Sequence, residues 1–324
     1  MNRILTGISL RSGVMRQLAI ATLCLLQSAP FAPAQERQPL VIAGPFTGIY
    51  APLGDLLKEQ VPTQAESAQT ILIDTRCDAQ RAATASLEIL ALSPKAVVGI
   101  PCIDVFDVMA PVLIEADISI TTVGLQTPDV TSDKAGLVRR VAPTLTQIHS
   151  RLAQHLSVAW RNVPFAIVDD GTLSGRLLAE QVGAALAGAS LEPIFRDTYR
   201  PLLSNQSALV RRLSRAGVQH VLLGGDSFDA SVIGADAQRL GLTLVIAGGP
   251  NLLGTIEDGQ LPDGTLMAAA PPFDELAALA MASLGLSSQT PNLTFDANGE
   301  PVENLSILLE VRDGTPIKIA PTSQ

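Results

Sequence analysis

The sequence contains little of what the common enzyme classes need. It has only three histidines, they show no metal-ligand spacing, and neither an HExxH motif nor a paired CxxC motif occurs. The GTLSG segment at 171–175 is not a GxSxG nucleophile elbow, because its serine comes one place late. No set of nucleophile, base and orienting residue can be named. We therefore expect no catalytic residues, no metal and no cofactor, and an enzyme is the least favoured hypothesis.

Positive charge and aromatic residues are also scarce. The 324 residues include 22 Lys and Arg against 31 Asp and Glu, which gives a net charge of −9. The basic residues are scattered, and Arg139–Arg140 and Arg211–Arg212 are short pairs rather than a basic stripe. Sequence-independent binding of nucleic acid needs many positive groups against phosphates, so we set this partner class aside. Aromatic residues make up 3% of the chain, which argues against a stacked platform for sugars.

The N-terminus has the pattern of an export signal. Arg3, Arg11 and Arg16 precede an apolar run at 18–26, after which Ala32 and Ala34 form an A-x-A cleavage pattern. A basic region, an apolar run too short to span a bilayer and small residues at the cut site describe a secretory signal peptide. We predict cleavage after Ala34, which removes residues 1–34 together with Cys24 and places the mature protein in the periplasm. An uncleaved membrane anchor is the alternative.

Two cysteines remain in the mature chain. Cys77 and Cys102 each come just after a short apolar run that is typical of a buried parallel strand. Successive parallel strands end at the same edge of a sheet, so we expect the two thiols side by side. An oxidising compartment would then join them as a disulfide worth roughly 3–4 kcal/mol. Two buried free thiols are the alternative.

Alternating strand and helix patterns predict an α/β fold. Short apolar runs predict strands at 40–43, 71–73, 96–100, 118–122, 165–168, 193–197, 218–223 and 243–247. Helical patterns fall between them at 79–92, 105–117, 144–160, 174–187, 207–216 and 230–240. Asp78 and Asp104 are expected to cap the first two helices. Two such successive blocks imply two doubly wound lobes, because parallel strands need covering helices on both faces.

The first block ends near 141–143 and the second near 268–272, where the AAAPP segment breaks the pattern. Beyond it, alternating apolar residues surround an Asn298–Gly299 turn and an Asp313–Gly314 turn, which predicts β-hairpin structure in the C-terminal tail.

The order of these motifs resembles the periplasmic branched-chain-amino-acid-type substrate-binding proteins of ABC transporters, which are Leu/Ile/Val-binding-protein-like and have the type I periplasmic binding fold. The matching segments are IAGPFTGIYAPLG at 42–54, DTRCDAQRA at 74–82, AVVGIPC at 96–102 and ISITTVGLQTPDVT at 118–131. The resemblance covers nearly the whole mature chain, and the separation of Cys77 and Cys102 matches that family's disulfide.

The resemblance implies two lobes joined by crossings, with a ligand clamped in the cleft and closure by hinge motion. Lobe 1 would comprise residues 35–142 and 270–295, and lobe 2 residues 143–269 and 296–324. The chain is short for this family between 54 and 71 and between 272 and 293, so we expect a reduced first lobe.

The function implied is that of a monomeric solute-binding protein that delivers a small polar solute, amino-acid-like or otherwise, to the permease of an ABC transporter. The alternative is a sensor or accessory binding protein that serves a receptor or a periplasmic oxidation system.

Departures from the family's ligand loops suggest what the solute is not. Ile103 stands where amino-acid-binding members usually have a hydroxyl, and Asp104, as a helix cap, would oppose a carboxylate ligand. Uncharged polar or acidic residues stand at several of the other expected positions, so we predict a ligand rich in donors or neutral polar groups. Its predicted contacts are Gln126, Ser174, Asp226 and Asn251, with Tyr50, Ile103, Gly124 and Phe228 as further wall residues. Asp226 has helix capping as an equal alternative, and Tyr50 and Phe228 have ordinary core packing.

Overall fold

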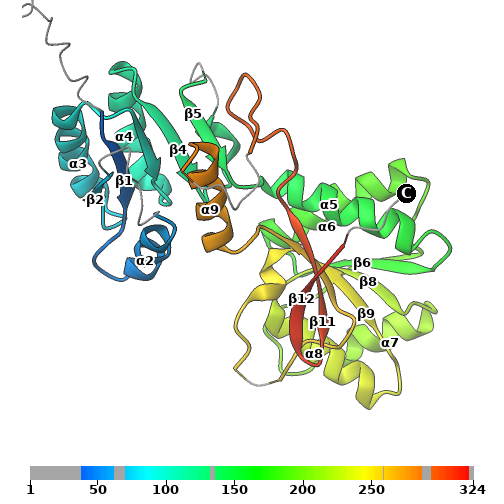
Figure 1. The fold of residues 1–324 in the computed structure, drawn as a ribbon. Coiled ribbons are helices and arrows are strands. Elements are labelled where there is room, and N and C mark those ends of the chain that lie inside the picture. The colour runs from blue at the N-terminus through cyan, green and yellow to red at the C-terminus, as the bar shows by residue number, and fades with distance from the viewer. Residues whose placement is uncertain (1–37, 62–69, 132–135, 258, 287–292, 321–324) are drawn as a thin grey trace, which may run out of the picture. The chain divides into compact units, whose positions relative to one another are not determined.

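The computed structural model describes residues 38–61, 70–131, 136–257, 259–286 and 293–320. The predicted signal peptide lies outside these ranges. Within them the protein is an α/β protein with two lobes, each built around a largely parallel sheet (Figure 1). No helix in these ranges is both long enough and apolar enough to cross a membrane.

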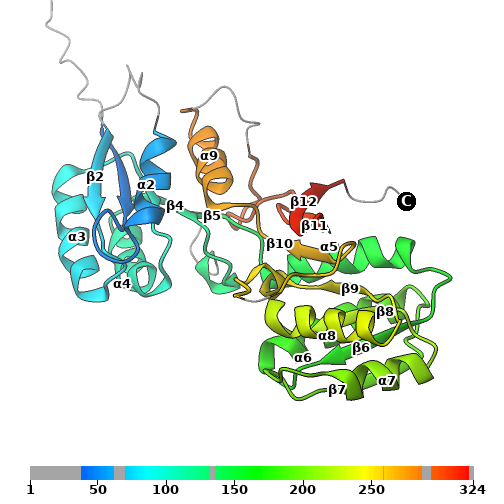
Figure 2. The same ribbon diagram turned by 90° about the horizontal axis from the view of Figure 1, so that it is seen from below.

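The first sheet has five parallel strands in the order β2-β1-β3-β4-β5. Its strands are β1 (Leu40–Gly44), β2 (Thr70–Asp74), β3 (Ala96–Gly99), β4 (Ser119–Val123) and β5 (Val138–Val141). Alternate residues of β1 face opposite layers. Val41 and Ala43 pack with α3 (Ala79–Leu92) and α4 (Ile103–Glu115), whereas Leu40 and Ile42 pack with α2 (Ala51–Glu59) and α9 (Phe273–Ser283). Figure 2 shows the two helix pairs on opposite faces.

The second sheet has seven strands in the order β12-β11-β10-β9-β8-β6-β7. Five are parallel: β6 (Phe165–Asp169), β7 (Phe195–Thr198), β8 (His220–Gly224), β9 (Val245–Gly248) and β10 (Leu266–Ala269). The last two, β11 (Ile307–Arg312) and β12 (Thr315–Ile319), form an antiparallel hairpin beside β10. One face packs on α5 (Leu145–Ala159) and α6 (Leu173–Gly188), and the other on α7 (Ser207–Arg215) and α8 (Ser227–Arg239). Two 3₁₀ turns, η1 (Pro128–Val130) and η2 (Pro250–Leu253), complete the elements.

Helix α9 packs against the sheet that does not contain its neighbouring strands. The strands before and after it, β10 and β11, belong to the second sheet. Leu276 and Ala280 of α9 are nevertheless buried with Ile42 and Val98 of the first sheet. The chain therefore runs from one sheet to the other three times, around residues 142–144, 270–272 and 302–306. The division of the chain into lobes by residue ranges stays a prediction.

Side-chain caps fix where several helices begin. Asp78 Oδ1 accepts a hydrogen bond from Arg81 N at 2.7 Å, so α3 covers the predicted range and the predicted cap is confirmed. Thr144 and Gln147 form a reciprocal capping box at α5. Thr172 caps α6, and Asp226 caps α8 by accepting from Asp229 N at 2.9 Å. Helix α8 therefore begins three residues before its predicted start.

The prediction that Asp104 caps α4 is wrong. Cys102 is the N-cap, in an extended conformation and without a side-chain cap bond, and its carbonyl oxygen accepts the first helical bond from Phe106 N at 3.0 Å. Since the disulfide fixes Cys102, the helix begins directly after it and Asp104 falls in the first turn. The objection to a carboxylate ligand is thereby reduced to the charge of Asp104 near the helix end.

Two strands differ from the prediction. The second block ends near 268–272 as predicted, but residues 266–269, for which no strand was predicted, form its last parallel strand, the buried β10. Residues 138–141 form β5, for which no strand was predicted. The C-terminal turns are confirmed: Asp313–Gly314 joins β11 to β12, and Asn298–Gly299 lies inside an antiparallel bridge between Phe295 and Pro301.

Candidate functional site

Exposed apolar side chains gather at one edge of each sheet. The described residues include fourteen large apolar side chains that are well exposed, and nine of them lie within six residues of the carboxyl end of a parallel strand. These nine are Ile49, Tyr50, Ile103, Leu145, Leu173, Leu202, Leu203, Phe228 and Leu253. In open α/β sheets this is the edge where ligands bind. Exposed apolar surface concentrated there indicates a surface that is covered during function.

The edge of the second sheet contains a cavity of about 420 Å³, within the range of small-molecule sites. Its walls come from the loops after β6, β8 and β9 and from the first turns of α5 and α6. The lining residues are Leu145, His149, Leu173, Ser174, Gly175, Leu177, Leu178, Gly224, Gly225, Gly249, Pro250 and Asn251. The cavity is therefore formed within the second lobe alone.

Four of the lining residues are glycines, and close backbone approach explains them. A methyl group at Gly175 would overlap Asp170 Oδ1 and would lie 2.5 Å from the carbonyl oxygen of Gly224. A methyl group at Gly225 would overlap the Tyr199 hydroxyl, and one at Gly249 would lie 2.6 Å from Leu178. Only glycine lets the start of α6 approach the end of β8 this closely.

Three polar side chains reach the cavity. Ser174 and Asn251 meet at its mouth, where Asn251 Nδ2 lies 3.5 Å from Ser174 Oγ. His149 is 96% buried and its Nδ1 lies 2.7 Å from Gln181 Oε1. An amide oxygen only accepts, so Nδ1 is the donor and Nε2 carries the lone pair. Burial lowers the pKa of the His149 imidazole, with the Gln181 bond acting in the opposite direction, so the ring is neutral at pH 7.

Carboxylates surround the cavity without lining it. Asp170 Oδ1 accepts from the backbone N and the hydroxyl of Thr172, at 2.9 and 2.7 Å, and so supports the turn before α6. Asp226 caps α8. Behind them Asp229 is fully buried and accepts from Leu202 N at 2.9 Å and from the Tyr199 hydroxyl at 3.2 Å. Burial raises the Asp229 pKa and the Asp226 charge adds to this, against the two hydrogen bonds.

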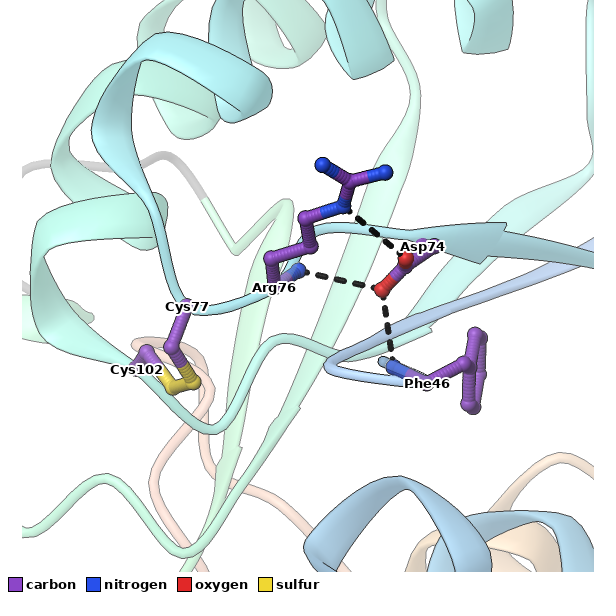
Figure 3. The surroundings of a disulfide bond; sticks show 5 residues. All are labelled: Phe46, Asp74, Arg76, Cys77 and Cys102. Atoms are coloured by element: carbon purple, nitrogen blue, oxygen red, sulfur yellow. Dashed lines mark hydrogen bonds and ion pairs between the residues drawn. A yellow bond between two sulfur atoms is a disulfide. The ribbon is translucent and has the colours of Figure 1, made fainter. Parts of the chain in front are cut away.

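The edge of the first sheet is organised around Asp74 and a disulfide (Figure 3). Asp74, the last residue of β2, accepts from Phe46 N at 2.8 Å, from Thr47 Oγ1 at 2.5 Å and from Arg76 N at 3.1 Å. The next turn carries Cys77, which is bonded to Cys102 with the two Cα atoms 5.5 Å apart. The predicted disulfide is confirmed. The loops after β1, β2 and β3 are thereby tied to one another.

The predicted ligand residues fall into two groups. Ser174 and Asn251 both line the second-lobe cavity and contact each other. Asp226 and Phe228 lie on the adjacent start of α8 and are not lining residues. On the first sheet, Tyr50 and Ile103 are exposed at the starts of α2 and α4, and Gly124 and Gln126 follow β4. Their role as ligand contacts stays a prediction.

Several lining residues could not be predicted from local sequence patterns. His149 shows no ligand spacing, and in the chain it is one polar position on the inner face of an amphipathic helix. Leu145 and Leu173 read as ordinary helix starts. Only the placement of α5 beside α6 brings them to the cavity. The described residues contain no group of three His, Cys, Asp or Glu side chains placed to hold a metal ion.

Two lobes of this topology and a cavity at the carboxyl ends of parallel strands define the class of type I periplasmic binding folds. Within that class, the chain belongs to the family described as receptor family ligand binding region, whose model matches residues 66–245, more than half of the chain.

Known proteins of this class resemble the chain at low identity. The Leu/Ile/Val-binding protein homolog 3 of Brucella melitensis is 24% identical over 225 residues, which cover 66% of this chain and 61% of that protein. The crystal structure of an ABC transporter substrate-binding protein from Desulfitobacterium hafniense in complex with Leu is 16% identical. It has a TM-score of 0.61 and covers 88% of this chain and 100% of the other. A solute-binding protein from Rhodopseudomonas palustris in complex with benzoate is 14% identical, with a TM-score of 0.54 and coverages of 87% and 95%.

Proposed function

We propose that the protein is a periplasmic solute-binding protein that captures a small molecule and presents it to the permease of an ABC transporter. The observation that carries this proposal is the cavity of about 420 Å³ at the carboxyl ends of β6, β8 and β9. Its lining is mostly leucine and glycine, with few polar atoms, which is the usual composition of small-molecule sites. Binding proteins among the relatives and structural neighbours support the same role.

The first sheet would supply the second wall of the site. Its exposed Ile49, Tyr50 and Ile103 lie in the equivalent loops, at the carboxyl ends of β1 and β3. Closure of the two lobes over a ligand would remove these apolar side chains and Leu145 and Leu173 from water. The benzoate-bound and leucine-bound neighbours differ in ligand chemistry, so the fold does not determine the solute.

Native mass spectrometry of the freshly purified chain tests the proposal, since binding proteins often retain their solute. We expect a carried small molecule, and we expect Ser174→Trp to abolish it because a large side chain at the mouth fills the cavity. Ala184→Trp places the same side chain on an exposed position of the same helix, outside the cavity, and should leave the solute bound.

A solute panel followed by thermal unfolding gives the same test for a protein that loses its ligand during purification. Stabilisation by at least one solute, absent in Ser174→Trp and present in Ala184→Trp, supports a binding protein. The proposal would be contradicted if the protein carries no small molecule and no solute of the panel stabilises it. Turnover of the bound compound would identify an enzyme instead. Co-purification with permease subunits tests the transporter partner, and its failure with an intact solute site favours a sensor.

A further inference from the structure

The polar groups of the cavity are unequal in what they offer a ligand. Ser174 and Asn251 are exposed at the mouth and contact each other. His149 is the buried polar side chain among the lining residues, and it comes from the inner face of α5. A buried polar group that faces a cavity fixes the orientation of a ligand more strongly than exposed groups at the rim.

The tautomer of His149 is set by its neighbour on α6. Nδ1 donates to Gln181 Oε1 at 2.7 Å. Nε2, the other ring nitrogen, lies 4.0 Å from the place that a Cβ of Gly249, a second lining residue, would occupy, and the described residues provide no hydrogen-bond partner for it. A neutral imidazole held in this way presents an acceptor to the cavity. A ligand that covers Nε2 without donating to it would leave a buried acceptor unpaired, which costs free energy, so the site favours a ligand that supplies a donor.

No lining residue carries a formal charge at pH 7. An ammonium or carboxylate group of a ligand would lose its hydration on entering the cavity without meeting an opposite charge. The neighbouring Asp170 and Asp226 are engaged with Thr172 and with the start of α8. An α-amino acid would therefore be poorly matched to this half of the site, because its ammonium group needs an anionic partner.

We propose that His149 is a ligand-binding residue whose Nε2 accepts a hydrogen bond from an uncharged N–H or O–H group of a small ligand with an apolar body. This inference rests on the proposed function and names the solute class of the same site. Leu145, Leu173, Leu177 and Leu178 enclose the apolar body. Gln181 is a positioning residue, which acts by holding the imidazole in the tautomer that accepts.

Three compounds with one carbon skeleton test the ligand class: 4-methylpentanamide, 4-methylpentanoate and L-leucine. Calorimetric titration of the unfolded and refolded protein, freed of any carried solute, gives their dissociation constants. We expect the amide to bind about tenfold or more tightly than the two charged compounds, as one buried hydrogen bond and an avoided desolvation predict. Tighter binding of leucine or of the carboxylate, or no binding of the amide, would overturn the inference.

Two variants test the residues. His149→Phe keeps a ring and removes the acceptor, so the affinity for the amide should fall about tenfold. Gln181→Met removes the acceptor that fixes Nδ1 and lets the ring present N–H to the cavity. The preference should then shift from the amide toward 4-methyl-2-pentanone, which only accepts. Gln154→Met, at an exposed position of α5, is the matched control and should change neither the affinity for the amide nor the preference between the two ligands.

The two variants also separate binding from folding. If His149→Phe does not fold, the change in preference caused by Gln181→Met decides the matter, because a purely structural role would not reverse a choice between donor and acceptor ligands. Unchanged amide affinity in His149→Phe, or unchanged preference in Gln181→Met, would contradict the inference. If Ser174→Trp loses the carried solute while His149→Phe and Gln181→Met keep it, the proposed function still stands although this inference fails.

Discussion

The ligand-side loops of the two lobes are held in place by different means. At the first sheet, a covalent bond and one carboxylate connect the loops: Cys77 is bonded to Cys102, and Asp74 accepts from two loops at once. At the second sheet, the loops are held by glycine contacts and by buried hydrogen bonds to Asp229. The described part of the second lobe has no disulfide, and it contains the cavity of about 420 Å³.

Size explains part of this difference. The first sheet has five strands and the second has seven, so the first lobe has less apolar surface to bury. A small core gains most from a cross-link, which lowers the entropy of the unfolded chain. The larger second lobe can hold its loops by close packing and can leave space for a ligand. The single tryptophan, Trp160, is buried in the second lobe against Phe165, so its fluorescence reports on that lobe alone.

The largest expected effect concerns the disulfide. Replacing Cys77 and Cys102 with alanine should lower the unfolding free energy of the first lobe by roughly 3–4 kcal/mol, the loop-closure value for a separation of 25 residues. Urea unfolding followed by far-UV circular dichroism should show this loss. The transition seen by Trp160 fluorescence should stay in place if the lobes unfold independently.

Reductant provides the control for that variant: it should destabilise the natural protein and leave the double variant unchanged. An equal shift of both signals would show that the lobes unfold as one unit. An unchanged dichroism transition would show that the bridge contributes nothing to stability.

The second expected effect concerns the glycine contact between α6 and β8. Gly175→Ala should cost about 1–3 kcal/mol, because the added methyl group meets a backbone oxygen that cannot move aside easily. Gly188→Ala, at the other end of the same helix, meets nothing within 4 Å and should be neutral or stabilising by about 0.5 kcal/mol. Trp160 fluorescence during urea unfolding measures both. Equal stability of the two variants would show that the contact between α6 and β8 can accommodate a methyl group.

The features of the two sheet edges also differ in how well they could be predicted from the sequence. Local signals were sufficient for α3, whose cap Asp78 and final Leu92 lie at the predicted positions, and for the disulfide, because parallel strands place their ends together. They failed at β5, where Arg139–Arg140 looks like a surface pair. Arg140 is 99% buried and forms an ion pair with Glu300, 160 residues further along the chain. A partner so distant leaves no local pattern.

The candidate site was harder to predict than the fold for the same reason. Ser174 and Asn251 lie shortly after the carboxyl ends of β6 and β9, and the ligand positions of the resembling family indicated them. His149 reaches the cavity only because α5 packs beside α6, and its tautomer depends on Gln181, which lies 32 residues away. Asp104 was misplaced because its capping pattern competes with the disulfide, which starts α4 at Ile103. Tertiary contacts determined each of these outcomes.

The smallest expected effect is a difference in pH dependence between the two edge carboxylates. Burial tends to raise the Asp74 pKa, but hydrogen bonds from Thr47, Phe46 and Arg76 outweigh it and hold the pKa below 3.8. The stabilisation by Asp74 is therefore present above about pH 4 and is lost as the pH falls through the folded-state value. Asp74→Asn should have a lower free energy of unfolding than the natural protein, and this difference should shrink as the pH falls below about 4.

Asp229 should behave in the opposite way. Because burial raises its pKa above 3.8, the folded protein holds this proton more tightly than the unfolded chain, and stability falls as the pH rises through the folded-state value. Asp229→Asn has no proton to lose, and its amide can still accept from Leu202 N and donate to the Tyr199 oxygen. Its stability relative to the natural protein should therefore improve as the pH rises above about 4, measured by Trp160 fluorescence. We expect opposite trends because, of these two carboxyl groups, only that of Asp229 is buried enough to resist ionisation. The same pH trend in both variants would contradict this difference between the two edges.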